Sequence, residues 1–243
     1  LKFELTDARL KLGEKENAIV GYEYCLSSIQ ATLEVTAQNI NKLRYDLTHD
    51  GVSTDTVWDF KQTCALVCRD TYNLLNNVYK NNNFEVSYIS FKRNSNGTAS
   101  AYMNSYEPKN NEMPSIYQRT IIIPKYATRK EQKKMYCFEK LYLEGTSAPL
   151  ILLDEEKVRR NFLFKNEEAK KTCKYKQYIA IPICCQSKKV IGMLQISALE
   201  NNIIKGDEIS IKKFLIAILR PIAYLTLLAN KTQDCIDSIT GGK

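Results

Sequence analysis

The chain contains 243 residues, 44% of them hydrophobic, and carries a formal net charge of +8 with a single histidine. This length and apolar content allow one or two globular domains with a buried core. The longest apolar stretch, residues 214–229, contains Arg220 and Pro221 and is shorter than the roughly 20 residues that cross a bilayer, so we expect neither a transmembrane helix nor a signal peptide. The lone histidine, His49, lies in a Gly-containing turn, and no phosphate-binding glycine motif occurs. Histidine-based catalytic designs, histidine metal clusters and phosphate-loop enzymes are therefore disfavoured.

The positive charge is concentrated in the second half of the chain. Residues 1–124 hold 13 Lys and Arg against 14 Asp and Glu, whereas residues 125–243 hold 22 against 13. Basic clusters attract nucleic acid, anionic lipid or a phosphorylated ligand, but they also occur on ordinary solvated surfaces. The solvated surface is the simpler interpretation, and nucleic-acid binding stays open as an alternative. The clusters are Lys125, Arg129, Lys130, Lys133 and Lys134, then Lys157, Arg159 and Arg160, then Lys170, Lys171, Lys174 and Lys176.

The first 48 residues have a heptad period. Apolar residues recur at intervals of seven, which is typical of an amphipathic helix that packs in a coiled coil or a bundle. Gly13 and Gly21 weaken such a helix, each by about 1 kcal/mol relative to alanine. We expect a long helix over residues 1–50 and a homodimer formed through it. The heptad residues are Leu5, Leu12, Ile19, Leu26, Leu33, Ile40 and Leu47.

The elements that follow alternate between helical and strand periodicity. A second helix is expected to begin after a cap at Ser53 or Thr54 and to end near Tyr79. From Phe84 the period changes to two, and Asn96-Gly97 separates the strands of a hairpin. The remaining expected elements are a strand over residues 117–124, a helix over 131–144, a short strand over 150–153, a short helix over 155–162, paired strands over 178–185 and 190–199, and a closing helix over 207–228 that Pro221 bends.

The last two strands carry a recognisable pattern. Tyr178-Ile179-Ala180-Ile181-Pro182-Ile183 ends in an apolar-Pro-apolar step, and Val190-Ile191-Gly192-Met193-Leu194-Gln195-Ile196 follows after a turn. Pro182 restricts a strand edge or bulge, and Gly192 allows a neighbouring backbone or ligand to approach closely. With the closing helix, this pattern resembles the GAF domain family over roughly residues 84–229. The resemblance implies an α+β fold with a central antiparallel sheet flanked by helices, preceded here by the long N-terminal amphipathic helix.

Other segments agree with the resemblance or depart from it. The segment from Glu131 to Asp154, with Phe162 and Phe164 beyond it, is similar to the family, whereas residues 107–128 form a longer connection than its members usually have. The Asn-Lys, Phe and Asp-Glu signature of cyclic-nucleotide-binding members is absent. No Cys or His placement points to a bilin or haem. The resemblance therefore leaves the ligand and any cofactor unknown.

The resemblance also indicates which residues line a ligand cavity. Aromatic residues lie on segments similar to its walls and lid, apolar residues and a glutamine lie on its floor, and two arginines near the lid suit an anionic ligand. Core packing and solvated surface are the simpler interpretations of each residue taken alone. The expected ligand-binding residues are Tyr102, Phe162, Phe164, Ile181, Ile183, Gln195, Arg159 and Arg160.

The eight cysteines lie mostly in apolar helical or strand-like runs, where a free cysteine behaves as a small hydrophobe. Cys64 and Cys68 share a helix face, and Cys184 and Cys185 are adjacent at a strand end. Nothing in the sequence brings the two pairs together as a metal or redox site. We expect core thiols in a reducing compartment, no metal site and no enzyme. A cysteine-dependent reductase of GAF fold is the weaker alternative.

These observations lead to a functional hypothesis. We expect a cytoplasmic sensory or regulatory module that binds a small metabolite or a partner in a GAF-like domain at residues 51–230. Its terminal helices relay the signal, and residues 231–243 form a C-terminal tail. The alternative is a protein or nucleic-acid interaction module that uses the basic second half and binds no small molecule. Because the chain begins at Leu1 and not at Met, whether it is a piece of a longer protein stays open, which leaves room for a membrane anchor upstream.

Overall fold

The computed structural model describes residues 60–109, 113–132, 135–161, 173–185 and 189–240, together with separate helical residues between Leu12 and Glu34. The expected domain boundary at residue 50 and the predicted site residues Phe162 and Phe164 lie outside the described residues. The long N-terminal helix over residues 1–50 stays a prediction, although every described residue between Leu12 and Glu34 is helical.

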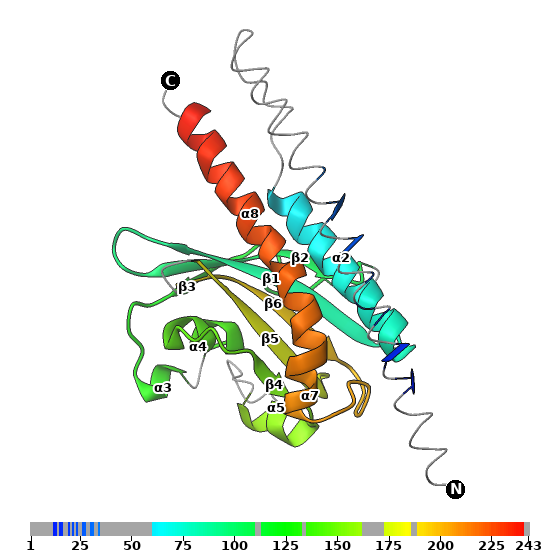
Figure 1. Ribbon diagram of the computed structural model, residues 1–243. Helices are drawn as coiled ribbons and strands as arrows, with labels where there is room; N and C mark the ends of the chain where they lie inside the picture. The colour runs from blue at the N-terminus through cyan, green and yellow to red at the C-terminus, as the bar shows by residue number, and fades with distance from the viewer. Residues whose placement is uncertain are drawn as a thin grey trace, which may run out of the picture.

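An antiparallel sheet forms the centre of the molecule (Figure 1). Its strands are β1 (Phe84–Arg93), β2 (Ala99–Glu107), β3 (Thr120–Ile123), β4 (Leu150–Leu152), β5 (Gln177–Cys184) and β6 (Val190–Ala198). The six strands lie in the order β3-β2-β1-β6-β5-β4. The predicted strand over residues 117–124 is β3, which pairs antiparallel with β2. The sheet and its flanking helices confirm the expected α+β architecture.

Helices cover both faces of the sheet. They are α2 (Phe60–Tyr79), α3 (Arg129–Gln132), α4 (Cys137–Glu144), α5 (Glu155–Asn161), α7 (Glu208–Ile211), the π-helical turn η2 (Lys212–Ile216) and α8 (Ala217–Thr240). The closing helix therefore extends to Thr240, beyond the predicted end at residue 228. No glycine or proline occurs between Ile222 and Thr240 to end it. None of the helices in the described part of the chain is long and apolar enough to cross a membrane.

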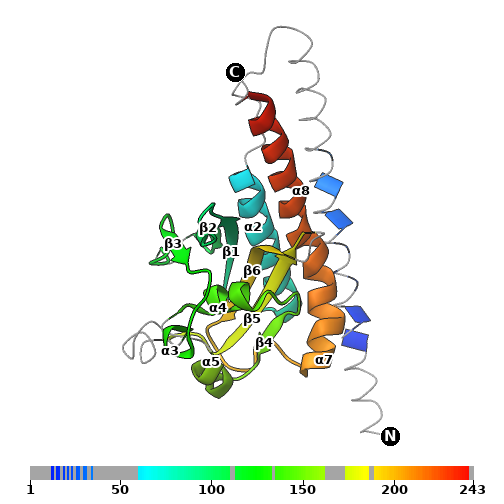
Figure 2. The same cartoon turned by 90° about the vertical axis from the view of Figure 1, so that its left-hand side faces the viewer.

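The face of the sheet beneath α2 and α8 is the larger part of the core. Figure 2 shows these two helices side by side on one side of the sheet and the short helices α3, α4 and α5 on the other. Alternate residues of β6, such as Leu194 and Ile196, pack with buried residues of both long helices, including Leu74 and Leu219. This side of the sheet is called the helix face below.

The opposite face has a smaller apolar cluster. Ile89 and Phe91 of β1 and Met193 of β6 pack there with Phe138 and Leu141 of α4. The two faces alternate along each strand because successive side chains point to opposite sides of a pleated sheet. This side of the sheet is called the open face below.

The N-terminal helical residues contact the helix layer through Gly21. A Cβ atom added to this buried glycine would lie 2.5 Å from Cδ1 of Ile218 and 3.9 Å from Cδ1 of Leu74. Because glycine has no side chain, Gly21 can lie this close to Ile218. Gly21 therefore has a role in packing, although glycine is a poor helix former. By contrast, the heptad residues Leu12, Ile19 and Leu26 are 58%, 58% and 67% exposed.

Candidate functional site: a basic cleft at one end of the sheet

A cavity lies where several chain segments meet at one end of the sheet. Its volume is about 420 Å³. The end of β1, the turn that contains Gly97, the chain after β3, the C-terminal end of α4 and the beginning of β6 form its walls. This cavity is called the basic cleft below, because three of its lining residues are Arg93, Lys125 and Lys189. Asp and Glu are missing from its described lining.

Each cation of the cleft comes from a different segment. Arg93 is the last residue of β1, Lys125 follows β3, and Lys189 precedes β6. All three side chains are exposed, and within the described part of the chain none of them forms an ion pair with a carboxylate. Three cations facing one cavity without a carboxylate repel one another, so a bound anion would lower the electrostatic free energy of the site.

The β1–β2 turn supports Lys125. The turn closes through a hydrogen bond from the Gly97 backbone N–H to the Asn94 carbonyl at 3.1 Å. Gly97 has φ of 84°, a left-handed conformation that favours glycine. A Cβ atom at this position would lie 3.1 Å from Cδ of Lys125, so the aliphatic stem of Lys125 rests against the turn. The predicted Asn96-Gly97 hairpin is thus also part of the cleft.

Aromatic rings form the apolar part of the cleft. Tyr142 on α4 stacks on Phe91 with ring centres 4.7 Å apart and an interplanar angle of 29°. Tyr126 is 78% exposed at the rim, and the Lys125 ammonium lies 5.2 Å from the centre of its ring. The ring faces therefore combine apolar area with a nearby positive charge.

Both ends of α4 are capped, which fixes the position of Tyr142. At the beginning of the helix, the Glu139 side chain accepts a hydrogen bond from the Tyr136 backbone N–H at 2.7 Å. At the end, Gly145 adopts a left-handed conformation, and its N–H donates to the carbonyls of Leu141 and Tyr142. These contacts satisfy two of the carbonyl groups at the C-terminal end of α4.

The open face also carries a buried polar network. The Tyr178 hydroxyl donates to Oε1 of Gln195 at 2.6 Å, and Nε2 of Gln195 lies 3.5 Å from Oγ of Ser87. Burial raises the pKa of Tyr178 well above its ordinary value, so the phenol stays protonated. A cavity of about 40 Å³ lies beside this network, lined in part by Ser87 and Tyr175. It is large enough for water but not for a metabolite.

The structure places the predicted floor and wall residues on different faces of the sheet. Gln195 lies on the open face, whereas Ile181 and Ile183 are fully buried in the core of the helix face. Tyr102 pairs with Ser90 across β1 and β2 and is 41% exposed. The four residues therefore do not converge on one cavity, and none of them lines the basic cleft. Their role in ligand binding stays a prediction.

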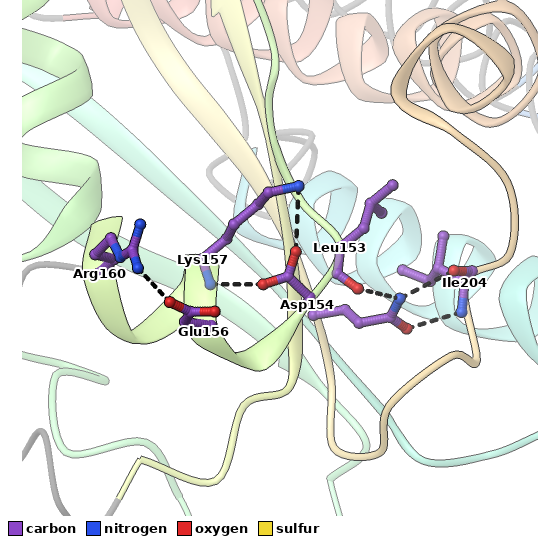
Figure 3. A network of polar contacts seen from close by, with 7 residues as sticks. Leu153, Asp154, Glu156, Lys157, Arg160 and Ile204 are labelled. Atoms are coloured by element: carbon purple, nitrogen blue, oxygen red, sulfur yellow. Dashed lines mark hydrogen bonds and ion pairs between the residues drawn. The ribbon is translucent and has the colours of Figure 1, made fainter.

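The predicted arginines lie on α5, where acidic neighbours neutralise them. Arg159 forms an ion pair with Glu155 at 2.7 Å. Arg160 pairs with Glu156, as Figure 3 shows. Glu155 also binds Lys176 at 2.7 Å. The hydrogen bonds from Lys176 and Arg159 lower the pKa of Glu155. These arginines are therefore engaged within α5 and do not face the cleft.

The N-terminus of α5 is anchored to the rest of the fold. Figure 3 shows Asp154 at this point, where its Oδ1 accepts a hydrogen bond from the Lys157 backbone N–H at 2.7 Å. That hydrogen bond lowers the pKa of Asp154. The neighbouring Leu153 carbonyl accepts from the buried amide of Gln177, which also exchanges two hydrogen bonds with the Ile204 backbone. Gln177 thus ties the chain before α5 to the chain before α7.

The cysteines do not assemble a metal site in the described part of the chain. Cys64 and Cys68 are buried in the helix face, and Cys137 is buried in the open face. Burial raises the pKa of Cys68 and of Cys137 to about 12, which disfavours the thiolate that binds metals and attacks disulfides. Cys184 and Cys185 are half-buried. The described residues contain no cluster of three or more His, Cys, Asp or Glu side chains that could bind a metal ion.

Sequence reasoning missed most of the basic cleft. It assigned Lys125 to a basic cluster but did not associate Lys125 with Arg93 or Lys189, which lie 32 and 64 positions away in the sequence. The available signal was local: each of the three cations stands beside a turn or a strand end. Only the strand order shows which of these positions lie close together at one edge of an antiparallel sheet.

Comparisons with known proteins give structural similarity without sequence similarity. No model of a protein family matches the sequence, and no curated protein matches it. A GAF domain/HD domain protein from Geobacter sulfurreducens is 12% identical, with a TM-score of 0.48 over 75% of this chain and 99% of that chain. The phycoerythrobilin-bound GAF domain of a cyanobacterial phytochrome is 13% identical, with a TM-score of 0.41 over 80% and 97%. A type II free methionine-R-sulfoxide reductase from Thermoplasma acidophilum is 11% identical, with a TM-score of 0.44 over 72% and 97%.

The reductase corrects one sequence-based prediction. We expected from the single histidine and the missing phosphate loop that the chain is not an enzyme. Proteins of similar structure include free methionine-R-sulfoxide reductases, so the fold is compatible with catalysis and that prediction is wrong. The proteins of similar structure also include the GAF domain of a cyanobacterial phytochrome. The described part of the chain has a six-stranded antiparallel sheet between two long helices and a layer of short ones, which is the α+β architecture that the GAF resemblance implies.

Proposed function

We propose that this chain is a sensory or regulatory module that binds a small ligand in the basic cleft and relays binding to its terminal helices. The observation that carries this proposal is the convergence of Arg93, Lys125 and Lys189 on a cavity of about 420 Å³ without a lining carboxylate. This volume lies within the roughly 300 to 1,000 Å³ of small-molecule pockets. Aromatic walls and a few polar groups are also typical of such pockets.

Two contacts connect the cleft to the closing helix. Ile191 of β6 lines the cleft and also packs against the core of the helix face. Arg220 on α8 donates a hydrogen bond at 3.3 Å to the Ser147 carbonyl, two residues after the cleft residue Gly145. A ligand that shifts either segment would change the packing of α8. This requires that the ligand binds two conformations of the protein with different affinity.

The next step of the relay leads from α8 to the N-terminal helix. Ile218, two residues before Arg220, contacts Gly21 on that helix. The exposed heptad residues Leu12, Ile19 and Leu26 then offer an apolar seam to a second copy of the chain. The proposed module is therefore a homodimer in which the helix layer lies between the ligand cleft and the dimer seam.

A thermal-shift screen with the full chain tests ligand binding. We expect a small set of metabolites to raise the melting temperature of the wild-type chain, because ligand that binds only the folded state stabilises it. The Arg93→Gln/Lys189→Gln variant should lose this response, whereas Lys92→Gln, an exposed neighbour on β1, should keep it. Equal responses of all three chains would contradict binding in the cleft.

The relay and the dimer require a second measurement. We expect sedimentation velocity to show a dimer of the wild-type chain, and Leu12→Asp/Leu26→Asp to be a monomer that still binds ligand. Replacing Arg220 with Gln should leave ligand affinity nearly unchanged but reduce the ligand-induced change in hydrogen exchange of α8. A wild-type monomer at high concentration would remove the dimer from the proposal.

The alternative function, nucleic-acid binding by the basic second half, is less well supported. Many of its described cations already pair with a carboxylate, including Lys140, Lys157 and Lys212 on three different helices. Lys174 likewise pairs with Glu85. Pairing of this kind reduces the continuous positive surface that a phosphate backbone requires. Salt-sensitive binding of single-stranded or duplex nucleic acid by the wild-type chain, lost in Arg93→Gln/Lys189→Gln, would favour the alternative.

A further inference from the structure

We propose that the ligand of the basic cleft is a small phosphate monoester that carries a flat ring. This inference rests on the proposed function, since it names the ligand class of the same site. It follows from the number of cations, from their chemistry and from the shape of the cavity that they face.

The charge of the cleft matches a dianion better than a monoanion. Arg93, Lys125 and Lys189 contribute three positive charges, and no Asp or Glu belongs to the described lining. A phosphate monoester carries a charge of roughly −1.5 to −2 at pH 7, because its second pKa is about 6. The C-terminal end of α4 opposes an anion through its partial negative charge. Gly145 caps two carbonyls of that end, and this reduces the opposing field.

The donors also suit phosphate better than carboxylate. A guanidinium group presents a planar fork that binds two oxygens at once, whereas an ammonium group acts as a point charge. Arg93, Lys125 and Lys189 approach the cavity from three different segments of the chain. A phosphate monoester offers three terminal oxygens to such a set, whereas one carboxylate offers two. The arrangement therefore favours a tetrahedral group bound on several sides.

The rest of the cavity indicates what the phosphate is attached to. After a phosphate group is accommodated, a cavity of about 420 Å³ has space for one further ring. Tyr126 at the rim and Tyr142 on the wall offer aromatic surface beside the cations. Stacking on such a ring adds roughly 0.5 to 1.5 kcal/mol to the apolar contact. A ring-bearing ester should therefore bind more tightly than an ester without a ring.

Isothermal titration calorimetry of the full chain with phenyl phosphate tests this inference. Phenyl sulfate is the matched probe for charge, because it has the same ring but one negative charge at every pH used. Glycerol 3-phosphate is the matched probe for the ring. We expect phenyl phosphate to bind at pH 7.5 at least tenfold more tightly than either probe, and its affinity to fall between pH 7 and pH 5 as the phosphate gains a proton.

Single substitutions locate the binding. Arg93→Gln, Lys125→Gln and Lys189→Gln should each weaken phenyl phosphate binding about tenfold, which corresponds to the loss of one charge-assisted hydrogen bond. All three side chains are exposed, so the variants should fold, and circular dichroism checks this. Lys92→Gln removes the same charge from the adjacent position, which points to the other face of β1, and should have no more than a twofold effect.

Each outcome bears on the inference. Equal affinity for phenyl phosphate and phenyl sulfate, or an equal effect of Lys92→Gln and Lys125→Gln, would overturn it in favour of unspecific charge attraction. If phenyl phosphate fails to bind while another compound in the thermal-shift screen depends on Arg93 and Lys189, this inference is wrong and the proposed function stands. If phenyl phosphate binds in the cleft but α8 exchange is unchanged, the ligand class is right and the relay is wrong.

Discussion

The two faces of the sheet differ in the size of their apolar cores and in the polar side chains that lie among them. On the helix face, Leu194, Ile196 and Ile181 pack with α2 and α8 in a continuous apolar core. On the open face, buried Gln195 and Tyr178 interrupt a smaller core, and cavities adjoin it. Close packing leaves little space for a ligand, whereas polar groups and short helices leave space and donors. The larger apolar core therefore lies on one face, and the open face is where we propose that a ligand binds.

On the helix face, a buried polar contact joins β1 to α8. The hydroxyl of the buried Tyr88 lies 2.7 Å from Oγ1 of Thr226 on α8. Tyr88 passes directly over Gly192, because a Cβ atom there would lie 2.0 Å from the hydroxyl oxygen. The glycine in the sequence pattern of β6 therefore accommodates a tyrosine side chain from the neighbouring strand β1.

The largest effect is expected from a cavity on the helix face. Leu194→Ala should lower the free energy of unfolding by about 3 kcal/mol, since a buried leucine loses both transfer free energy and contacts. Chemical denaturation measures this loss. The control, Ile122→Ala on the edge strand β3, is 56% exposed and should change stability by less than about 0.5 kcal/mol. Similar losses in the two variants would contradict the assignment of the stable core to the helix face.

A somewhat smaller loss is expected from overfilling the same face. Gly192→Ala places a methyl group where the Tyr88 hydroxyl lies, so Tyr88 must move away from Thr226. We expect a loss of about 2 kcal/mol in denaturation experiments. Gly13→Ala is the comparison, because no atom lies within 4 Å of its added Cβ. That variant should be neutral or stabilising.

On the open face, one hydroxyl tests the buried polar network. Tyr178→Phe leaves Oε1 of Gln195 without its donor and should lower the free energy of unfolding by about 1.5 kcal/mol. Tyr126→Phe removes a hydroxyl from a ring that is 78% exposed and should leave stability unchanged. A neutral Tyr178→Phe would mean that water replaces the lost hydroxyl, and the open face would then be more hydrated than its burial indicates.

The smallest effect is expected from acid, and it should be confined to α5. Hydrogen bonds lower the pKa of Asp154 and of Glu155 in the folded chain. Their stabilisation is therefore present above their ordinary pKa values of 3.8 and 4.5 and is lost as the pH falls through the lowered values. Hydrogen exchange at decreasing pH, corrected for the intrinsic rate, should show α5 losing protection before α2. Simultaneous loss in both helices would show that these carboxylates stabilise the whole fold.

Most of the sheet could be predicted from the sequence because its signals are local. Alternating residues after Phe84, the Asn96-Gly97 turn and the apolar-Pro-apolar step at Pro182 each indicate a strand or a hairpin within a few residues. The closing helix was predicted too short, because its polar last turns resemble a tail. Its length follows from the absence of glycine and proline between Ile222 and Thr240.

The candidate site could not be predicted in the same way. Ile181 and Gln195 both lie on predicted strands, but the sequence alone does not show which face each presents to a ligand. The structure assigns Ile181 to the core of the helix face and Gln195 to the open face. Arg159 and Arg160 were predicted from their charge, yet acids one turn away on α5 pair with them. Charge that is visible in a sequence does not indicate whether a partner already neutralises it.

The sequence by itself determined the kind of elements and their approximate order, because hydrophobic period, turns and caps act over a few residues. It also determined that the second half of the chain is basic. Only the tertiary structure decided that Arg93, Lys125 and Lys189 line one cavity while cations such as Lys140, Lys157 and Lys176 pair with carboxylates. The physical reason is that strand order brings strand ends that are distant in the sequence to one edge of the sheet. Electrostatic free energy depends on the distances between charged groups and not on their separation in the sequence.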